Sequence, residues 1–235
     1  MHHVLCSISY VTGQFFHVKY VVIFGLNSLF AYIDGLVPPP PPICISRVSR
    51  YSRMWRHFDH GLYQFLKHQV YIPIMKPVLP PLLSVLRALV SLVAVFSIVI
   101  AWHGARPHYI AWVSLSAFEL IIERFGSAIW STSMAEKIRQ KVGPQNSRRL
   151  VALSMLFTVI PGIFGVFFFL GEEGVGDVVF KNILLQGLKD GLTMNIRFFD
   201  MTSAGFILLH LLTMGYFFNN VCLDLDMARG KTKVQ

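Results

Sequence analysis

The chain has 235 residues, of which 54% are hydrophobic and only 14% are charged, whereas a soluble domain has about 25% charged residues. Together with a mean hydropathy of +0.56, this composition excludes an ordinary soluble domain and indicates an integral membrane protein. The net charge of +9 comes mostly from basic residues in short segments between apolar stretches, as in the cytoplasmic loops of membrane proteins. The expected partner of this charge is therefore the lipid bilayer and not nucleic acid.

The three cysteines are Cys6, Cys44 and Cys222, which lie far apart and form no Cys-x-x-Cys pair. An odd number at such spacing predicts neither a disulfide framework nor a zinc site, so no metal is expected. The N-terminus lacks the charged and then apolar pattern of a cleaved signal peptide.

Five apolar stretches follow one another along the chain. The second, residues 79–102, is long enough to cross a hydrocarbon core of about 30 Å, and the fourth contains a Pro161-Gly162 pair that predicts a kink. We predict an all-α integral membrane protein, a multi-span helical bundle with about five spans and short amphipathic or re-entrant helices. The expected spans are 15–33, 79–102, 108–122, 150–170 and 203–219.

Two amphipathic segments, Gly61–Ile74 and Phe180–Leu192, are too short to span a membrane. Each is expected either to lie in the interface or re-enter the membrane, or to be a plain surface helix. The five prolines of Pro38–Pro42 exclude a helix interior and predict an extended stretch between the first span and the basic residues that follow.

Charge asymmetry predicts how the chain crosses the membrane. Residues 47–76 and 124–149 are basic, whereas residues 171–179 are acidic. If the basic segments are cytoplasmic, His103 lies toward the lumenal side and Asp59 begins on the cytoplasmic side.

His103 and Asp59 are the residues whose chemistry stands out. An imidazole has a pKa near neutrality and can take a proton from an attacking nucleophile, and a carboxylate can orient such a base or the nucleophile. Polar groups at the end of an apolar helix are costly to bury without a partner or a function. Each also has a plainer explanation: His103 as a hydrogen-bonded residue at the water interface, and Asp59 as a surface acid paired with Arg56 or Lys67.

Several stretches resemble the membrane-bound O-acyltransferase family in its hedgehog-acyltransferase branch. The most specific is Met54–Ile74, with the sequence MWRHFDHGLYQFLKHQVYIPI. The others are Ile33-Asp34-Gly35-Leu36 before the prolines, Ile43-Cys44-Ile45-Ser46, Trp102-His103-Gly104, Glu123 and KNILLQG at 181–187.

The resemblance implies that His103 is the family's catalytic histidine and that Asp59 is its second catalytic polar residue. It implies transfer of palmitate from palmitoyl-CoA to the N-terminal cysteine of a secreted hedgehog-like signalling protein, in the membrane of the endoplasmic reticulum or Golgi. It also implies that residues 1–235 form the C-terminal portion of an acyltransferase domain, because full-length relatives carry several spans before this region.

The same resemblance implies that Cys44 is a ligand of haem b; the alternative is an inert or palmitoylated cysteine. Arg47 and Arg50 are expected to contact either the phosphates of CoA or anionic lipid headgroups. Arg87, inside the second span, is expected to pair with Glu119 or Glu123.

Two other functions stay open at this point. One is a catalytically inactive membrane paralogue or truncated product that binds partners. The other is an acyltransferase of the same family that acts on a lipid or on a serine hydroxyl.

Overall fold

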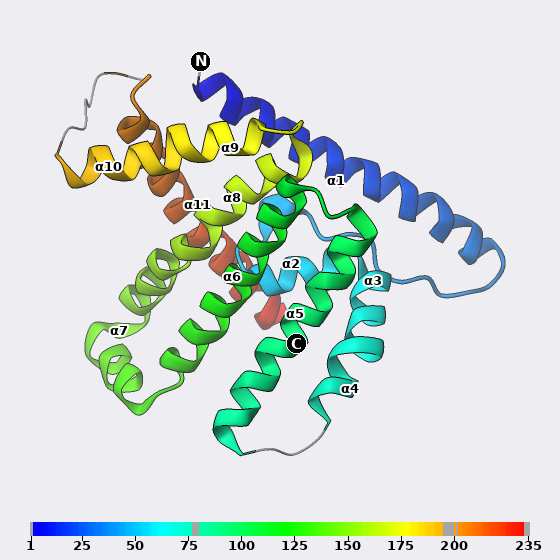
Figure 1. Ribbon diagram of the computed structural model, residues 1–235. Helices are drawn as coiled ribbons and strands as arrows, with labels where there is room; N and C mark the ends of the chain where they lie inside the picture. The colour runs from blue at the N-terminus through cyan, green and yellow to red at the C-terminus, as the bar shows by residue number, and fades with distance from the viewer. Residues whose placement is uncertain (1, 77–79, 195–199, 201, 233–235) are drawn as a thin grey trace.

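The computed structural model describes residues 2–76, 80–194, 200 and 202–232. It is helical, with no strand among these residues, which confirms the predicted all-α class (Figure 1). The helices are α1 (His2–Ile33), α2 (Tyr51–Phe58), α3 (His60–Phe65), α4 (Ile72–Met75), α5 (Pro81–His103), α6 (Pro107–Trp130), α7 (Ser133–Ser154), α8 (Leu156–Leu170), α9 (Val175–Val179), α10 (Gln186–Leu192) and α11 (Ala204–Thr232). A 3₁₀ helix, η1 (Ile45–Arg47), precedes α2, and two π-helical segments, η2 (Leu66–Tyr71) and η3 (Phe180–Leu185), interrupt the shorter helices.

Four helical stretches of the described chain are long and apolar enough to cross a membrane. They are Val11–Ile33, Leu83–His103, Ser133–Leu170 and Ala204–Ala228. Four of the five expected spans overlap these stretches, whereas the expected span 108–122 lies in α6, which is not among the four. Residue 79, the first of the expected span 79–102, lies outside the described residues. The membrane character is thus confirmed, and the number of spans stays a prediction.

The proline run forms the extended connection that the sequence predicts. No helix is present from residue 36 to residue 44, because consecutive prolines lack the N–H groups that helical hydrogen bonds need. Backbone pairing then fixes the end of this connection, since the N–H of Ile43 donates to the carbonyl of His57 at 2.9 Å. The connection therefore delivers η1 and α2 to the middle of the bundle (Figure 1).

Two apolar clusters form the core of the described chain. One joins α8, α9, η3 and α11 around Phe164 and Ile183, which are 1% and 0% exposed. The other joins η2, α5 and α6 around Leu66, Phe96 and Val113. In the segment Phe180–Leu192, Ile183 is fully buried in the first cluster, whereas Lys181, Asn182 and Lys189 are exposed, so the segment covers the bundle with one face.

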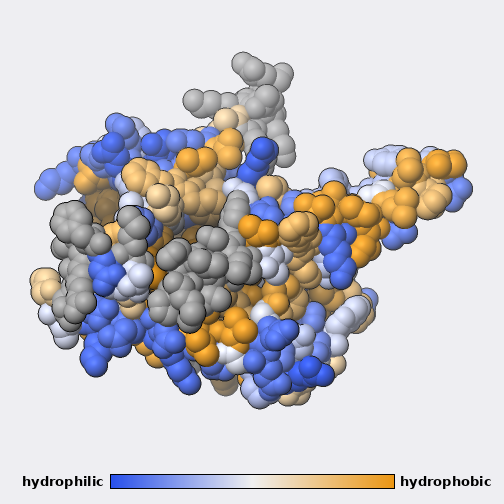
Figure 2. All heavy atoms as spheres, turned by 90° about the horizontal axis from the view of Figure 1, so that it is seen from above, coloured by the Kyte–Doolittle hydropathy of each residue, from blue (hydrophilic) through white to orange (hydrophobic). Residues whose placement is uncertain are grey.

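Helix α1 has a different environment, because many of its large apolar side chains are exposed. Phe15, Val22 and Ile33 are 71%, 61% and 72% exposed. Seen from above, apolar side chains cover the arm that projects from the molecule at the right of Figure 2, where Figure 1 has the end of α1 and the following loop. An exposed apolar face of this size fits contact with lipid or with other membrane helices.

The close approach of α10 to α11 depends on Gly187. A Cβ atom at this position would lie 2.8 Å from Cβ of Leu208 and 2.9 Å from the carbonyl oxygen of Ala204. We therefore expect Gly187→Ala to push the helices apart and to lower the free energy of unfolding by about 1–3 kcal/mol, measured by thermal unfolding in detergent. Gly191→Ala in the same helix is the matched control, because nothing lies within 4 Å of its added Cβ. An equal loss of stability in both variants would contradict the packing argument.

Candidate active site

His103 is the last residue of α5, and the backbone that follows fixes its place. Gly104 has a φ of 94°, a conformation that glycine adopts at little cost. Its N–H donates to the carbonyl of Ile100 at 2.8 Å, and the N–H of Arg106 donates to the carbonyl of Gly104 at 2.9 Å. Helix α6 then starts at Pro107, a residue well suited to the first helical turn. The sharp turn holds the imidazole between the adjoining ends of α5 and α6.

Aromatic rings surround the half-buried imidazole of His103. Its ring centroid lies 5.5 Å from that of Tyr109, 5.3 Å from that of Trp112 and 5.3 Å from that of Phe169. Trp112 and Phe169 also stack on each other, with centroids 4.2 Å apart. No hydrogen bond to the imidazole is found within the part of the chain that the structure describes, so a ring nitrogen is available for proton transfer.

Asp59 lies between α2 and α3 and caps the second of them. It has extended backbone angles, and its Oδ1 accepts a hydrogen bond from the N–H of Leu62 at 2.9 Å. This is the usual arrangement of an N-cap aspartate. The carboxylate is half-buried, and Tyr20 of α1 lies near enough to interact with it electrostatically. Among the described residues, Asp59 forms no ion pair with Arg56 or Lys67. The structure therefore gives no support to the plainer alternative of a paired surface acid.

Three phenylalanine rings connect the surroundings of Asp59 to His103, and we call Phe58, Phe16 and Phe169 the aromatic bridge. Phe58 precedes Asp59 and stacks on Phe16, with ring centroids 5.6 Å apart. Phe16 meets Phe169 edge-on at 5.3 Å, and Phe169 contacts His103. The bridge draws on α1, α2 and α8, so the fold brings Asp59 and His103 to one apolar region.

That His103 and Asp59 begin on opposite sides of the membrane stays a prediction, while ring contacts of the fold bring the surroundings of the two residues together. The segment from α3 to α4 runs back along α5 in the opposite direction (Figure 1), and its residues pack on α5. The start of α3 therefore lies level with the end of α5. The prediction counted charges along the chain, and charge alone does not show that a segment folds back beside the following helix.

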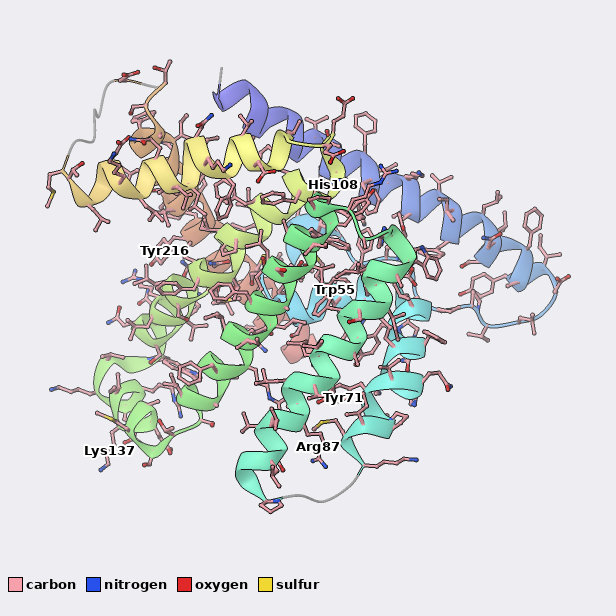
Figure 3. The ribbon with its side chains drawn as sticks, in the orientation of Figure 1. Trp55, Tyr71, Arg87, His108, Lys137 and Tyr216 are labelled. Atoms are coloured by element: carbon pink, nitrogen blue, oxygen red, sulfur yellow. The ribbon has the colours of Figure 1, made fainter. Side chains whose placement is uncertain are left out.

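Two tryptophans extend the apolar surroundings toward the middle of the bundle. Trp55 of α2, labelled in Figure 3, stacks on Trp112 with centroids 6.0 Å apart and meets Phe96 of α5 edge-on at 5.5 Å. Since α2 carries Trp55 and ends next to Asp59, its position also sets that of the carboxylate. Tyr51, at the start of α2, shares a 2.8 Å hydrogen bond with Ser116 of α6.

Titration of α2 residues follows from their surroundings. Burial, and then the nearby carboxyl of Glu119, raise the pKa of Tyr51 above its ordinary range, so its phenol stays protonated. Partial burial, and then the charge of Arg53, lower the pKa of His57. His57 is therefore mainly neutral at physiological pH.

Cys44 and the arginines predicted to bind CoA lie near the same helix. Cys44 directly follows Ile43, whose N–H bonds to the carbonyl of His57, two residues before Asp59. The cysteine is half-buried, whereas Arg47 and Arg50 are exposed. Among the described residues neither arginine forms an ion pair. Contact of the two arginines with the phosphates of CoA or of lipids stays a prediction.

The structure gives no support for haem at Cys44. No group of three His, Cys, Asp or Glu side chains within the described part of the chain could hold a metal ion. Haem b stays an expectation from the resemblance.

The predicted pairing of Arg87 with Glu119 or Glu123 is wrong for the described residues. Glu123 accepts hydrogen bonds from the backbone N–H and the hydroxyl of Ser52. Two guanidinium nitrogens of Arg87, which Figure 3 shows near Tyr71, are buried without a hydrogen-bond partner in the described part. Glu119 is fully buried with its carboxyl against Gly162, where a Cβ would lie 3.6 Å from Oε1.

Sequence reasoning missed most of the rings around His103. Tyr109 and Trp112 are spaced three residues apart just after the histidine, which places them on one face of a helix, and this signal was available. Phe16 and Phe169 come from helices far away in the sequence, and no local pattern distinguishes them from other apolar residues.

The fold thus combines a half-exposed imidazole, aromatic rings beside it and a nearby carboxylate with helices that are long and apolar enough to cross a membrane. The sequence model of the membrane-bound O-acyltransferase family matches residues 3–166. That match covers more than half of the chain, and the chain belongs to this family.

Three relatives have similar sequences. Protein-cysteine N-palmitoyltransferase HHAT of Mus musculus is 34% identical over 174 residues, and protein-cysteine N-palmitoyltransferase Rasp of Drosophila melanogaster is 31% identical over 183 residues. These matches cover 74% and 77% of this chain but 34% and 36% of the relatives. The HHAT-like protein of Mus musculus is 30% identical over 154 residues, covering 63% of this chain and 28% of that protein. The chain thus spans about one third of the length of the curated relatives it matches.

Proposed function

We propose that this chain carries the proton-transfer part of an acyltransferase that moves palmitate from palmitoyl-CoA to the N-terminal cysteine of a secreted signalling protein. The observation that carries the proposal is the aromatic bridge, which joins the surroundings of Asp59 to His103 in an apolar region. Two relatives are protein-cysteine N-palmitoyltransferases, which supports palmitate as the transferred group and a protein cysteine as the acceptor. The proposed location is the membrane of the endoplasmic reticulum or Golgi.

In the proposed reaction, the acceptor's amine nitrogen attacks the carbonyl carbon of the thioester. The carbon–sulfur bond breaks, an amide bond forms, and CoA leaves as the thiol. A nitrogen of His103 takes the proton that the amine loses and returns it to the departing sulfur. Asp59 orients the nucleophile or stabilises the positive charge that develops on it. The rings beside His103 provide apolar surface for the end of the acyl chain nearest the thioester.

The test supplies membranes containing the chain with a palmitoyl-CoA analogue that carries a terminal alkyne and with a peptide that has an N-terminal cysteine. We expect hydroxylamine-resistant label on the peptide, because an amide resists the reagent that cleaves a thioester. The matched control peptide has the same sequence with an acetylated N-terminus and should stay unlabelled.

Labelling no higher than in membranes that lack the chain would contradict the proposal and favour an inactive membrane paralogue. Label on phospholipid or on a serine-containing peptide, with none on the cysteine peptide, would favour the alternative acceptors.

A further inference from the structure

The first turn of α2 is capped by a side chain from another helix. Arg50, the residue before α2, makes no capping hydrogen bond with its own side chain. Instead, the carboxylate of Glu123, in α6, accepts a hydrogen bond from the backbone N–H of Ser52 at 2.9 Å and another from the Ser52 hydroxyl. The first N–H groups of a helix have no partner within the helix, and they attract negative charge. Glu123 is therefore a cap that α6 supplies to α2.

Further contacts between α2 and α6 lead from this cap to the candidate site. Tyr51 and Ser116 share a hydrogen bond of 2.8 Å, and Trp55 stacks on Trp112. In α6, Trp112, Ser116 and Glu123 follow one another at spacings of four and seven residues, which places them on one face of the helix. Trp112 also contacts the imidazole of the candidate site, at a centroid distance of 5.3 Å. The cap thus lies at one end of the contact and the candidate site at the other.

Helix α2 connects the cap to Asp59. It runs without a break from Tyr51 to Phe58, and Asp59 follows directly. Since a helix rises 1.5 Å per residue, about 10 Å separate Ser52 from Asp59 along the axis. A helix moves as a unit over such a length, so a shift of its first turn also displaces its end. A displacement of about 1 Å at a reacting group can cost about 100-fold in rate.

Glu123 makes the strongest of the side-chain links at the first turn of α2. Its two hydrogen bonds go to a half-buried carboxylate, and bonds to an ionised acceptor are roughly twice as strong as those between neutral groups. The bond of Tyr51 joins two neutral hydroxyls. Arg53 pairs with Asp226 of α11, but these side chains are 29% and 31% exposed, and ion pairs that solvent reaches contribute little. Loss of Glu123 should therefore shift α2 more than loss of either other link.

We propose that Glu123 is a positioning residue for acyl transfer. By capping α2 from α6, it sets the position of Asp59 relative to His103. The role rests on the function proposed above, because it requires that Asp59 takes part in the transfer. Glu123 acts through α2 and needs its hydrogen bonds to Ser52, whereas its charge is secondary.

The test compares Glu123→Ala with the conservative Glu123→Gln. The amide of glutamine can accept from the N–H of Ser52 and donate to its hydroxyl oxygen. We expect Glu123→Ala to lower the kcat of palmitate transfer about 10- to 100-fold and to leave the KM for palmitoyl-CoA within about twofold. Glu123→Gln should stay within about threefold of the wild-type kcat. Backbone hydrogen exchange over residues 51–58, measured by mass spectrometry in detergent, should be about fivefold faster in Glu123→Ala and unchanged in Glu123→Gln.

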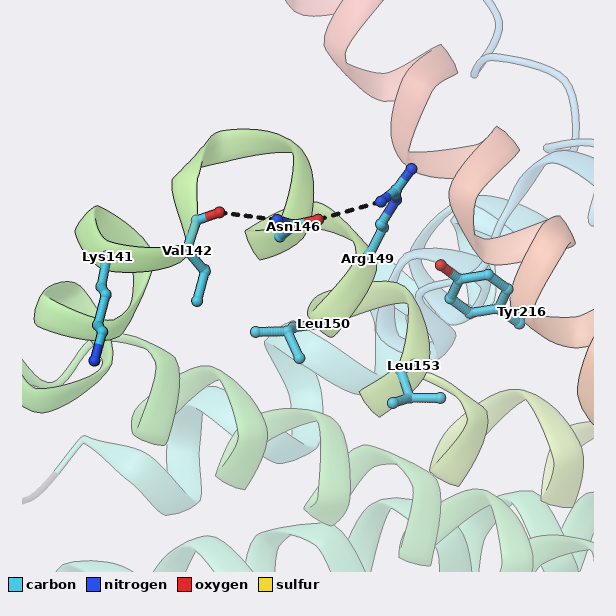
Figure 4. A pocket seen from close by; sticks show the side chains of 7 residues that line it. All are labelled: Lys141, Val142, Asn146, Arg149, Leu150, Leu153 and Tyr216. Carbon is cyan, nitrogen blue, oxygen red and sulfur yellow. Dashed lines mark hydrogen bonds between the residues drawn. The ribbon is translucent and has the colours of Figure 1, made fainter.

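Two control variants separate this role from other effects of mutation. Gly187→Ala strains the packing of α10 on α11 and controls for lost stability. Asn146→Ala also removes two hydrogen bonds of one side chain, those with the carbonyl of Val142 and with Arg149 of α7 (Figure 4). Both variants should keep the wild-type kcat per folded molecule and the wild-type exchange over residues 51–58.

Full kcat in Glu123→Ala, despite faster exchange of α2, would overturn the positioning role and leave the proposed acyl transfer standing. An equal loss of kcat in Glu123→Ala and Glu123→Gln would also overturn it, because the charge would then matter and the hydrogen bonds would not. Absence of transfer by the wild type would contradict the proposed function, and with it the role in transfer. Exchange would still show in that case whether Glu123 caps α2, since it is measured without substrate.

Discussion

Replacing His103 with alanine is expected to lower acyl transfer by at least about 100-fold, the usual contribution of a general base. The fold should survive, because the imidazole is half-buried and none of the described residues forms a hydrogen bond to it. The measurement compares transfer of the alkyne-labelled palmitate by equal amounts of membrane-inserted wild type and variant.

His68→Ala is the matched control for this prediction. His68 is exposed on η2, in the segment that packs beside α5 but away from the aromatic bridge. We expect it to keep full activity. If His103→Ala, correctly inserted and thermally as stable as the wild type, kept its activity, the histidine would not be the base.

Substitutions of Asp59 can separate the effect of its negative charge from the effect of its hydrogen bond at the start of α3. Asparagine can still accept the hydrogen bond from the N–H of Leu62, because Asn and Asp are about equally good N-caps. We expect Asp59→Asn to keep the thermal stability of the wild type and to lose about 100-fold or more in acyl transfer, because the carboxylate charge is gone.

Asp59→Ala completes the comparison. It removes the cap and should lower the free energy of unfolding by about 1 kcal/mol, in addition to the loss of transfer. Thermal unfolding and palmitate incorporation are measured on the same preparations. Full transfer by Asp59→Asn would show that the residue acts only by capping α3, and its catalytic role would have to be abandoned.

The helices of this chain were predictable where long apolar runs set their lengths. Among the described residues, the expected spans 79–102 and 203–219 each overlap one long helix, because a run of about 20 apolar residues has few alternatives in a membrane. The expected span 108–122 is less clear. Its helix is longer than expected, and its fully buried Ser116 and Glu119 make it more polar than the other spans.

The candidate site was predictable only in part. His103 and Asp59 are candidates from the sequence alone, because Asp59 lies in the specific motif Met54–Ile74 and His103 is a polar residue at the end of a long apolar stretch. Their shared region depends on tertiary contacts, chiefly those of Phe16 and Phe169, which no periodicity within one helix reveals. The pairing expected for Arg87 was wrong for a similar reason. Ser52 donates hydrogen bonds to the carboxylate of Glu123, and the sequence does not show which donor lies beside a carboxylate in the fold.

The tight connection from Gly104 to Arg106 has a consequence for how the protein is made. It joins α5 and α6 so closely that the two helices form one hairpin, and His103, Tyr109 and Trp112 all belong to it. Contacts between residues so close in sequence form early. We therefore expect two of the histidine's three ring contacts, those with Tyr109 and Trp112, to form while the ribosome is still synthesising α8, and the contact with Phe169 of α8 to form last.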